Sequence, residues 1–211
     1  MELLVGLASI ALVSLLGAMS PGPSFLFVAR ISIAQTRKNG IFAALGMGIG
    51  GMVFALLALL GLKAVFISIP WLYSVLKILG GMYLVYVGIQ IWRGAKETIE
   101  MQLDDCEMRH TPWKSCITAL FTQLSNPKTA IFYGSIFAAL LPQTVSWYLF
   151  IVLLFMVFSI EAAWYCVVAL LLSAAAPRTV YLRSKFWIDR VAGSVMGLLG
   201  AKLITSNDAI V

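Results

Sequence analysis

Three ionisable side chains lie well inside long apolar stretches of the sequence, away from their ends: Lys77, Lys128 and Glu161. A charge at the centre of a lipid bilayer costs about 2.5–3.5 kcal/mol on an insertion scale, so such residues usually mark a path for a substrate, ion or proton. The short side chain of Glu161 lies in the middle of its stretch and cannot reach an interface. Burial disfavours its ionised form and a nearby lysine favours it, which makes Glu161 a candidate proton carrier.

Each of these charges also has a plainer interpretation. Glu161 could belong to a structural ion pair, and Lys77, six residues after Trp71, could extend its ammonium to the membrane surface. Lys128 could hold a substrate carboxylate or neutralise backbone carbonyls freed by the neighbouring Pro127. Several uncharged side chains could donate hydrogen bonds inside a cavity or simply belong to the core or the interface: Tyr83, Tyr86, Tyr133, Tyr165 and Gln123.

Two short proline motifs interrupt apolar stretches, Ser20-Pro21-Gly22-Pro23-Ser24 and Ser125-Asn126-Pro127-Lys128-Thr129. A proline inside a helix removes a backbone donor and breaks or kinks the helix. Each motif also predicts a helix start, with Ser20 or Asn126 as the N-cap and Pro21 or Pro127 at the first helical position. We therefore expect half-helices over 24–33 and 129–141, whose N-terminal amides suit a carboxylate. The alternative is a pair of proline kinks used only for packing.

The composition excludes a water-soluble globule. Of 211 residues, 61% are hydrophobic and 11% charged, against about 45–50% and about 25% in ordinary soluble domains. No basic face is clustered as nucleic-acid binding requires. One histidine and three widely spaced cysteines predict no metal site, no disulfide and no cofactor.

Six apolar stretches are each long enough to cross a hydrocarbon core about 30 Å thick. They cover residues 3–29, 41–62, 71–92, 115–141, 147–174 and 187–205. Lysine and arginine concentrate in the loops after the first, third and fifth stretches, the last of which holds Arg178, Arg183, Lys185 and Arg190. Basic residues stay on the cytoplasmic side, so we expect both termini outside the cytoplasm. If the broken first stretch did not cross, five spans would remain.

The chain divides into two halves around its long polar linker, 93–113. The two proline motifs lie 106 residues apart, and Gly81 and Gly88 match Gly193 and Gly200 at an offset of 112. This predicts one transmembrane domain, 1–211, with repeat one at 1–92, a cytoplasmic linker and repeat two at 114–211. Three spans per half place the second half upside down, as in many secondary transporters. The expected fold is therefore all-α, with six membrane helices in two inverted repeats and helices one and four broken.

Glycines at a four-residue spacing mark faces where helices approach closely. Gly46 and Gly50 form one such pair, and Gly193 and Gly197 form another. These faces predict packing inside the chain or, alternatively, contacts in a homodimer.

The assembled motifs resemble the LysE/RhtB superfamily of amino-acid exporters. The matching segments are S-P-G-P at 20–23, V-L-K-I-L-G-G-M-Y-L-V-Y-V-G-I-Q-I-W-R at 75–93, N-P-K-T at 126–129, Glu161, and G-S-V-M-G-L-L-G at 193–200. The resemblance implies a multi-pass carrier of the bacterial inner membrane that exports amino acids or related metabolites, with energy from the proton gradient. It also implies a substrate site at Pro21, Gly22, Pro23, Ser24, Lys77, Asn126, Pro127 and Lys128, with Glu161. An aspartate is also found in the family where this chain has Glu161.

From these features we expect a carrier for a zwitterionic amino acid that alternates access between the two sides. Half-helix amides with Lys128 or Lys77 would hold the carboxylate, and Glu161 would hold the ammonium or the coupling proton. A passive small-solute channel built on the two half-helices is the alternative, and a membrane scaffold assembled through glycine faces is a third possibility. An enzyme is not expected, because no nucleophile, base and orienting group occur at usable spacing.

Overall fold

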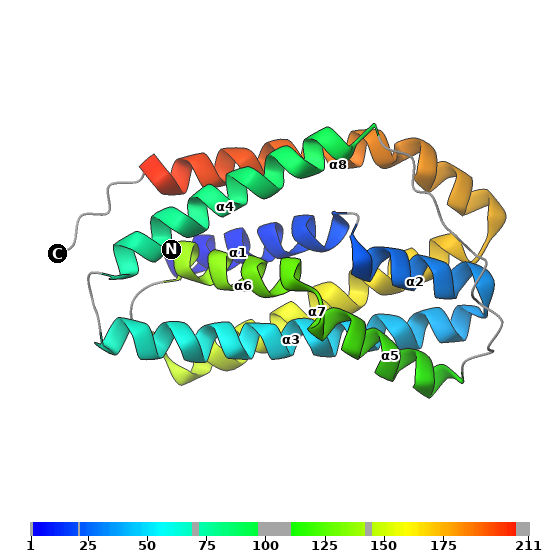
Figure 1. Ribbon diagram of the computed structural model, residues 1–211, viewed down its shortest axis with the longest axis horizontal. Coiled ribbons are helices and arrows are strands. Elements are labelled where there is room, and N and C mark those ends of the chain that lie inside the picture. The colour runs from blue at the N-terminus through cyan, green and yellow to red at the C-terminus, as the bar shows by residue number, and fades with distance from the viewer. Residues whose placement is uncertain (1, 21, 69–71, 97–110, 142–144, 206–211) are drawn as a thin grey trace.

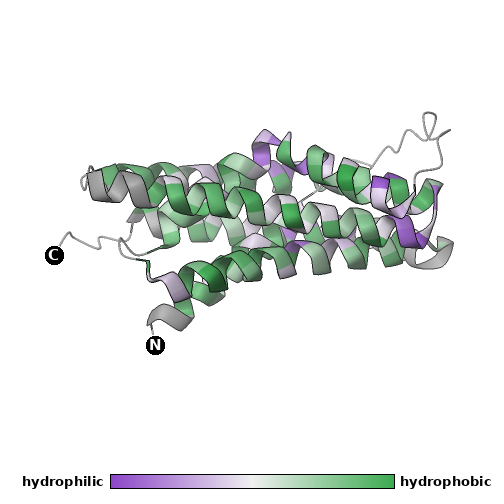
Figure 2. Cartoon of the chain, turned by 90° about the horizontal axis from the view of Figure 1, so that it is seen from below, coloured by the Kyte–Doolittle hydropathy of each residue, from purple (hydrophilic) through white to green (hydrophobic). Residues whose placement is uncertain are grey.

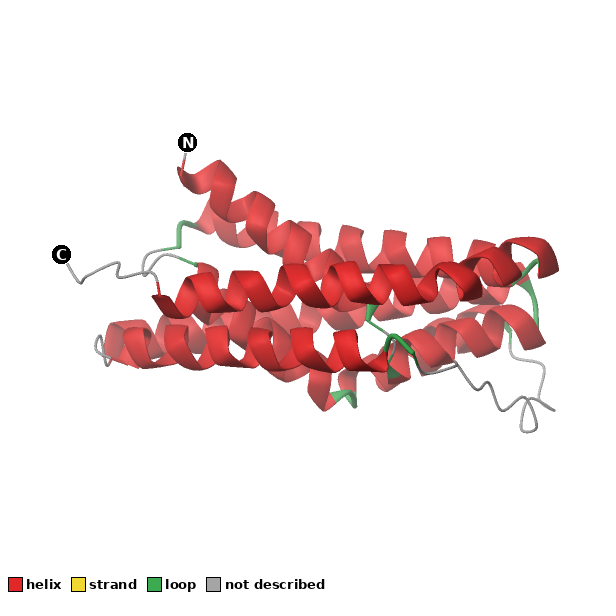
Figure 3. Ribbon diagram, turned by 90° about the horizontal axis from the view of Figure 1, so that it is seen from above, coloured by secondary structure: helices red, strands yellow, loops and turns green. Residues whose placement is uncertain are grey.

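The computed structural model describes residues 2–20, 22–68, 72–96, 111–141 and 145–205. Within these ranges the secondary structure is helical, joined by short turns and loops (Figure 3). The helices are α1 (Glu2–Met19), α2 (Pro23–Ala34), α3 (Arg37–Ser68), α4 (Leu72–Gly94), α5 (Pro112–Leu124), α6 (Pro127–Leu140), α7 (Trp147–Leu172) and α8 (Ala175–Thr205). The all-α prediction is confirmed for the described chain.

The helices lie along the long axis of an elongated bundle (Figure 1). The start of α1 and the end of α8 lie at one end, whereas α2 ends and α5 begins towards the other. Apolar residues cover most of the length of the bundle, and hydrophilic residues gather at the end away from the termini and near the middle of the bundle (Figure 2). This distribution is typical of a membrane-embedded protein.

Two of the described helices are long and apolar enough to cross a membrane, Arg37–Leu62 within α3 and the whole of α7. The pair α1 and α2 makes a third if it is counted as one span bent by 59°. The first apolar stretch is therefore broken, as its proline motif predicts. The arrangement of six spans in two repeats stays a prediction at this point.

The two interrupted stretches have the predicted architecture, with one difference at the first. α6 begins at Pro127 with Asn126 as its N-cap, as predicted. α2 begins at Pro23 with Gly22 as its N-cap, so the start predicted from Ser20 and Pro21 is wrong. The amide of Ser20 donates to the carbonyl of Gly17 at 3.3 Å, and Ser20 therefore still belongs to the last turn of α1. Pro21 lies outside the described residues.

The sixth apolar stretch is preceded by helix rather than by the predicted loop. α8 begins at Ala175, so the four basic residues assigned to a loop, Arg178, Arg183, Lys185 and Arg190, are helical. Pro177 falls in the first turn of α8, where a missing amide costs no helical hydrogen bond. Lys185 is buried against Asp189, four residues on, and this pairing allows a polar segment to pack as helix.

Glycines let the helices of this bundle approach closely. A Cβ added at Gly88 would lie 2.7 Å from the carbonyl oxygen of Gly193, and one at Gly200 would lie 2.6 Å from that of Gly81. These contacts join α4 to α8, which lie side by side in Figure 1. A Cβ at Gly46 would lie 2.1 Å from the carbonyl oxygen of Cys116, so α3 is similarly close to α5. The predicted glycine faces are thus used for packing inside the chain.

Candidate functional site

The two helix interruptions meet inside the bundle. α1 and α5 arrive from opposite ends, and α2 and α6 continue away from the breaks (Figure 1). The side chain of Asn126, at the start of α6, donates from Nδ2 to the Oγ of Ser24, at the start of α2, at 2.9 Å. Two helix N-termini with their partial positive charges therefore face a common space.

Glu161 is buried beside these helix starts, with 4% of its surface exposed. Tyr133 donates its hydroxyl to Oε1 at 2.7 Å, and Gln123 donates from Nε2 to Oε2 at 2.9 Å. The Oγ of Ser24 donates in turn to Oε1 of Gln123. A continuous chain of hydrogen bonds therefore runs from Asn126, through Ser24 and Gln123, to the carboxyl group of Glu161.

Glycine also shapes the surroundings of Glu161. A Cβ added at Gly51 of α3 would lie 3.1 Å from the Cδ of Glu161. At Gly48, one turn earlier, an added Cβ would lie 2.9 Å from the Cβ of Ala162. The backbone of α3 thus closes one side of the carboxyl group and keeps lipid and bulk water from it.

Lys128 brings a positive charge to the same space without pairing with Glu161. Its Nζ donates to the Oγ of Ser20 at 2.7 Å, across the breaks of α1 and α6. The Nζ lies 3.6 Å from the position that a Cβ at Gly22 would occupy. No ion pair within 4 Å joins Lys128 to Glu161 in the described structure, although both side chains line one cavity.

The two helix N-termini at the site differ in how their amides are satisfied. The Oδ1 of Asn126 accepts from the amide of Lys128 at 3.1 Å, which caps α6. Gly22 has no side chain, so no side-chain cap is formed at α2. The first amides of a helix have no partner within the helix. The amide of Ser24 is therefore the more available donor for an anion, and the ammonium of Lys128 lies close to the nearby Gly22.

The space between these groups is a small cavity of about 20 Å³. Its polar lining comprises Ser20, Ser24, Asn126, Lys128, Thr129 and Glu161, with Gly22 and Tyr165 among its other walls. A cavity of at least about 10–15 Å³ holds one water molecule, so this one has room for about one water and not for an amino acid. Binding of a larger molecule requires these walls to move apart.

The structure brings together most of the residues predicted for the site. Gly22, Ser24, Asn126, Lys128 and Glu161 all line the cavity. Pro23 and Pro127 are exposed and act as the first residues of α2 and α6. Pro21 and the side chain of Lys77 lie outside the described residues.

Ser20, Gln123 and Tyr133 have clearer roles in the structure than their types alone indicated. Ser20 was predicted as a helix cap and instead holds the ammonium of Lys128. The buried pair of Lys185 and Asp189 in α8 was not identified from the sequence at all. Its signal was present in the four-residue spacing of opposite charges, which places both side chains on one helical face.

An apolar helical bundle with charged and amide groups enclosed at two helix breaks defines a membrane transport protein. The sequence matches the family described as LysE type translocator over residues 15–207. It is 34% identical over 206 residues to the threonine efflux protein of Escherichia coli (strain K12), which covers 94% of this chain and 97% of that protein. The threonine efflux protein of Salmonella typhi is similar to the same extent.

An uncharacterized membrane protein of Haemophilus influenzae is 31% identical over 200 residues, covering 93% of this chain and 94% of that protein. No solved structure matched the chain. The chain belongs to the LysE family of translocators, so it is a membrane transporter and not an enzyme. The family resemblance inferred from the proline and glycine motifs is confirmed.

Proposed function

We propose that this protein exports amino acids from the bacterial cytoplasm across the inner membrane, driven by the proton gradient through alternating access. The observation that carries the proposal is that the ammonium of Lys128, the uncapped start of α2 and the carboxyl group of Glu161 line one cavity. Buried charges of both signs suit the two ends of a zwitterion. The names of the relatives, threonine efflux proteins, support an amino acid as the substrate.

The carboxylate of the substrate binds Lys128 and the amide of Ser24 in this mechanism. Lys128 has three donors, and Ser20 accepts from one of them, so the ammonium retains donors for a second anionic partner. The positive end of α2 adds to the attraction because Gly22 leaves it without a side-chain cap. Lys77 remains a further candidate for the carboxylate.

The ammonium of the substrate or the coupling proton binds Glu161. The two oxygens of this carboxyl group accept from the neutral donors Tyr133 and Gln123, and none of the lysine side chains that the structure describes forms an ion pair with it. An ammonium and a proton therefore compete for one carboxylate. Protonation from the outer side would weaken the hold on the ammonium and favour release there, which couples proton entry to export.

The repeat architecture supports alternating access. We propose six spans, with repeat one at 1–92, a cytoplasmic linker at 93–113 and an inverted repeat two at 114–211. In the sequence Gly81 corresponds to Gly193 and Gly88 to Gly200. In the structure Gly81 contacts Gly200, and Gly88 contacts Gly193. Such reciprocal contacts are what a two-fold axis relating the two halves produces.

The size of the cavity supports a closed conformation of such a carrier. A carrier opens its site to one side at a time, and about 20 Å³ is too little for an amino acid. Opening requires α1 or α5, the two segments that end at the breaks, to move away from the cavity. An open pore would instead have to be continuous through this position.

The experiment is efflux from cells loaded with a panel of labelled amino acids, measured with and without a proton uncoupler. Saturable, uncoupler-sensitive release of one chemical subset is expected. Release that neither saturates nor responds to the uncoupler would contradict the proposal and favour a passive channel.

The variant Glu161→Gln should lose gradient-driven efflux while reaching the membrane in normal amounts, because it keeps the size of the side chain and removes the titratable group. Glu97→Gln, in the polar linker, is the matched control and should export normally. Wild-type efflux by Glu161→Gln would remove Glu161 from the mechanism.

A further inference from the structure

A second buried pair of charges lies close to the site, in α8. The Nζ of Lys185 donates to Oδ2 of Asp189 at 2.7 Å, and both residues are almost completely buried. The same Nζ donates to the carbonyl oxygen of Gly94, the last residue of α4, at 3.0 Å. A buried ion pair adds little net stability, because the cost of desolvation offsets the attraction of the two charges. Stability alone therefore does not explain the presence of Lys185 and Asp189 inside the bundle.

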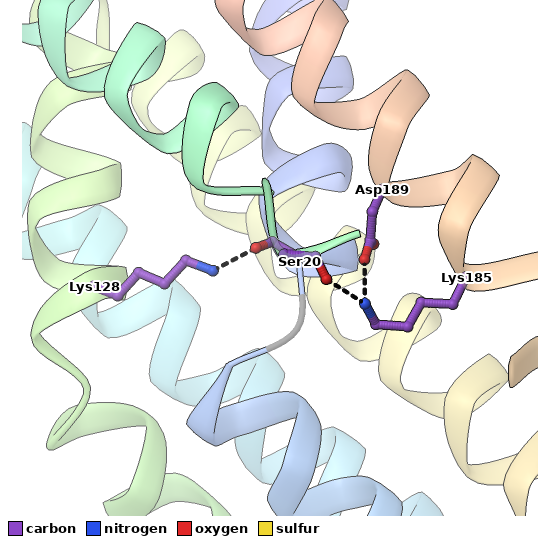
Figure 4. A network of polar contacts seen from close by, with 5 residues as sticks. Ser20, Lys128, Lys185 and Asp189 are labelled. Atoms are coloured by element: carbon purple, nitrogen blue, oxygen red, sulfur yellow. Dashed lines mark hydrogen bonds and ion pairs between the residues drawn. The ribbon is translucent and has the colours of Figure 1, made fainter. Parts of the chain in front are cut away.

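The pair lies beside the break of α1 (Figure 4). In Figure 4 Ser20 lies between Lys128, which approaches from α6, and the pair of Lys185 and Asp189 on α8. Lys128 lines the same cavity as Glu161, yet its ammonium is bound to Ser20, on the side where Asp189 lies. The ammonium of Lys128 therefore lies towards Ser20 and Asp189 rather than against Glu161.

The charges around Lys128 explain this position. The acidic side chains whose charges act on its ammonium are those of Asp189 and Glu161. Tyr83 of α4 donates to the backbone carbonyl of Lys128 at 3.4 Å, Tyr165 lines the cavity, and Tyr133 donates to Glu161. Among the described side chains, Asp189 and Glu161 are thus the two negative charges that compete for Lys128.

Lys185 leaves part of the charge of Asp189 available to Lys128. The carbonyl end of α4 carries a partial negative charge, and Lys185 interacts with this end through Gly94 as well as with Asp189. Close glycine packing holds α4 and α8 together, so Lys185, Asp189 and Gly94 form one rigid group. Asp189 therefore presents a fixed negative charge towards the break of α1.

We propose that Asp189, held by Lys185 and the end of α4, is a positioning residue that keeps the ammonium of Lys128 at Ser20 and Gly22, away from Glu161. This inference rests on the proposed function, in which Lys128 binds the substrate carboxylate. Without the charge of Asp189, Lys128 pairs with Glu161 across the cavity. That internal ion pair occupies both groups the substrate needs, so the substrate binds more weakly.

The test replaces the charged pair by a neutral one and measures efflux from vesicles of labelled threonine or, if the panel identifies another amino acid, of that one. The double variant Lys185→Gln with Asp189→Asn keeps a hydrogen-bonded pair of similar shape without charge. Lys185→Met with Asp189→Leu replaces it by apolar side chains, a change that buried ion pairs often tolerate. Asp189→Glu, which keeps the charge, is the conservative control.

The expected result is a weaker affinity for the substrate at an unchanged amount of protein in the membrane. Either neutral pair should reach the membrane and unfold at the wild-type temperature, with KM for threonine raised about tenfold or more, equivalent to about 1.4 kcal/mol. The control variant Asp189→Glu, which keeps the negative charge, should have a KM near the wild-type value. When Glu161→Asp is added to a neutral-pair variant, KM should fall part of the way back to the wild-type value. The reason is that the shorter side chain weakens the ion pair with Lys128 that competes with the substrate.

Two results would overturn the inference. A wild-type KM in a neutral pair would mean that Asp189 does not position Lys128. If neither neutral-pair variant reached the membrane, the pair of Lys185 and Asp189 would be needed for folding. A group that only positions Lys128 is not needed for folding or insertion. Failure of the proposed function looks different: the wild type would then show no saturable, uncoupler-sensitive export of any amino acid in the panel, or Lys128→Met would export its substrate normally.

Discussion

The two helix breaks in this molecule have similar sequences, but the helices that follow them differ in their N-terminal caps. Both α2 and α6 begin with a proline, Pro23 and Pro127, immediately after a break in a membrane-embedded stretch. At α6 Asn126 caps the helix and also donates to Ser24. At α2 the corresponding residue is Gly22, which offers no cap.

From this difference we propose that the residue before the proline decides whether a helix break can bind a ligand. An asparagine satisfies the amides of its own helix and makes the break a structural joint. A glycine leaves the amides open and leaves room for the ammonium of Lys128. We therefore assign anion binding to the start of α2 and support of the site to the start of α6.

The largest effect is expected for Lys128→Met, which removes the cation shared by the two breaks. A hydrogen bond to a charged group contributes about 1.5–3 kcal/mol, so the apparent affinity for substrate should fall about 10- to 100-fold. Lys202→Met, which removes an exposed lysine of α8, is the matched control. The measurement is KM for efflux at equal membrane abundance, and an unchanged KM would take Lys128 out of the site.

The next effect is expected for Gly22→Asn, which gives α2 the cap that α6 already has. The backbone of Gly22 is extended, with φ −165°, so an asparagine is accommodated, and a Cβ there makes only an ordinary contact with Lys128. A new cap stabilises a helix by a few tenths of a kcal/mol relative to glycine, while it occupies the amide intended for the substrate. Efflux should fall although the unfolding temperature does not.

Gly22→Ala separates the two causes in that variant, because alanine adds bulk without a capping oxygen. We expect its efflux to lie between those of the wild type and Gly22→Asn. Equal losses in the two variants would show that space next to Lys128, and not the open amide, is what matters at Gly22.

The smallest effect on transport is expected at the capped break. Asn126→Ser keeps an N-cap oxygen and should retain most activity, whereas Asn126→Ala should lower the free energy of unfolding by about 1 kcal/mol through loss of the cap. The measurement is thermal unfolding of the purified protein together with efflux. A loss of substrate affinity in Asn126→Ser as large as that in Lys128→Met would show that both breaks bind the substrate directly.

The local features of this fold were predictable because they depend on neighbouring residues. The break at Pro127 and the cap at Asn126 follow from backbone chemistry within three positions. The exposed Trp113 and Trp147 lie at the starts of α5 and α7, where amphipathic rings favour a lipid–water interface, whereas the exposed Trp187 lies inside α8. The first break was predicted, but its helix start was misplaced, because Ser20 completes α1 instead of capping α2.

The partners of the buried charges were not predictable in the same way. Glu161 was identified as an isolated acid, but its donors Tyr133 and Gln123 come from two other helices. Lys185 was assigned to a loop because hydropathy averages over a segment and does not register that Lys185 and Asp189 share one buried face. Residues far apart in the chain meet only when helices pack.

Composition and the order of residues were thus sufficient for the membrane environment, the positions of the breaks and the family, since each reflects short-range chemistry or overall apolar content. The packing of α3 on α5 and of α4 on α8, which depends on glycines facing backbone across the bundle, decided which polar groups share the cavity. Only that packing places Lys128 at Ser20 and Gly22 while Glu161 accepts from Tyr133 and Gln123. The physical reason is that electrostatic and hydrogen-bond partners are chosen by distance in space, which helix periodicity along the chain does not specify.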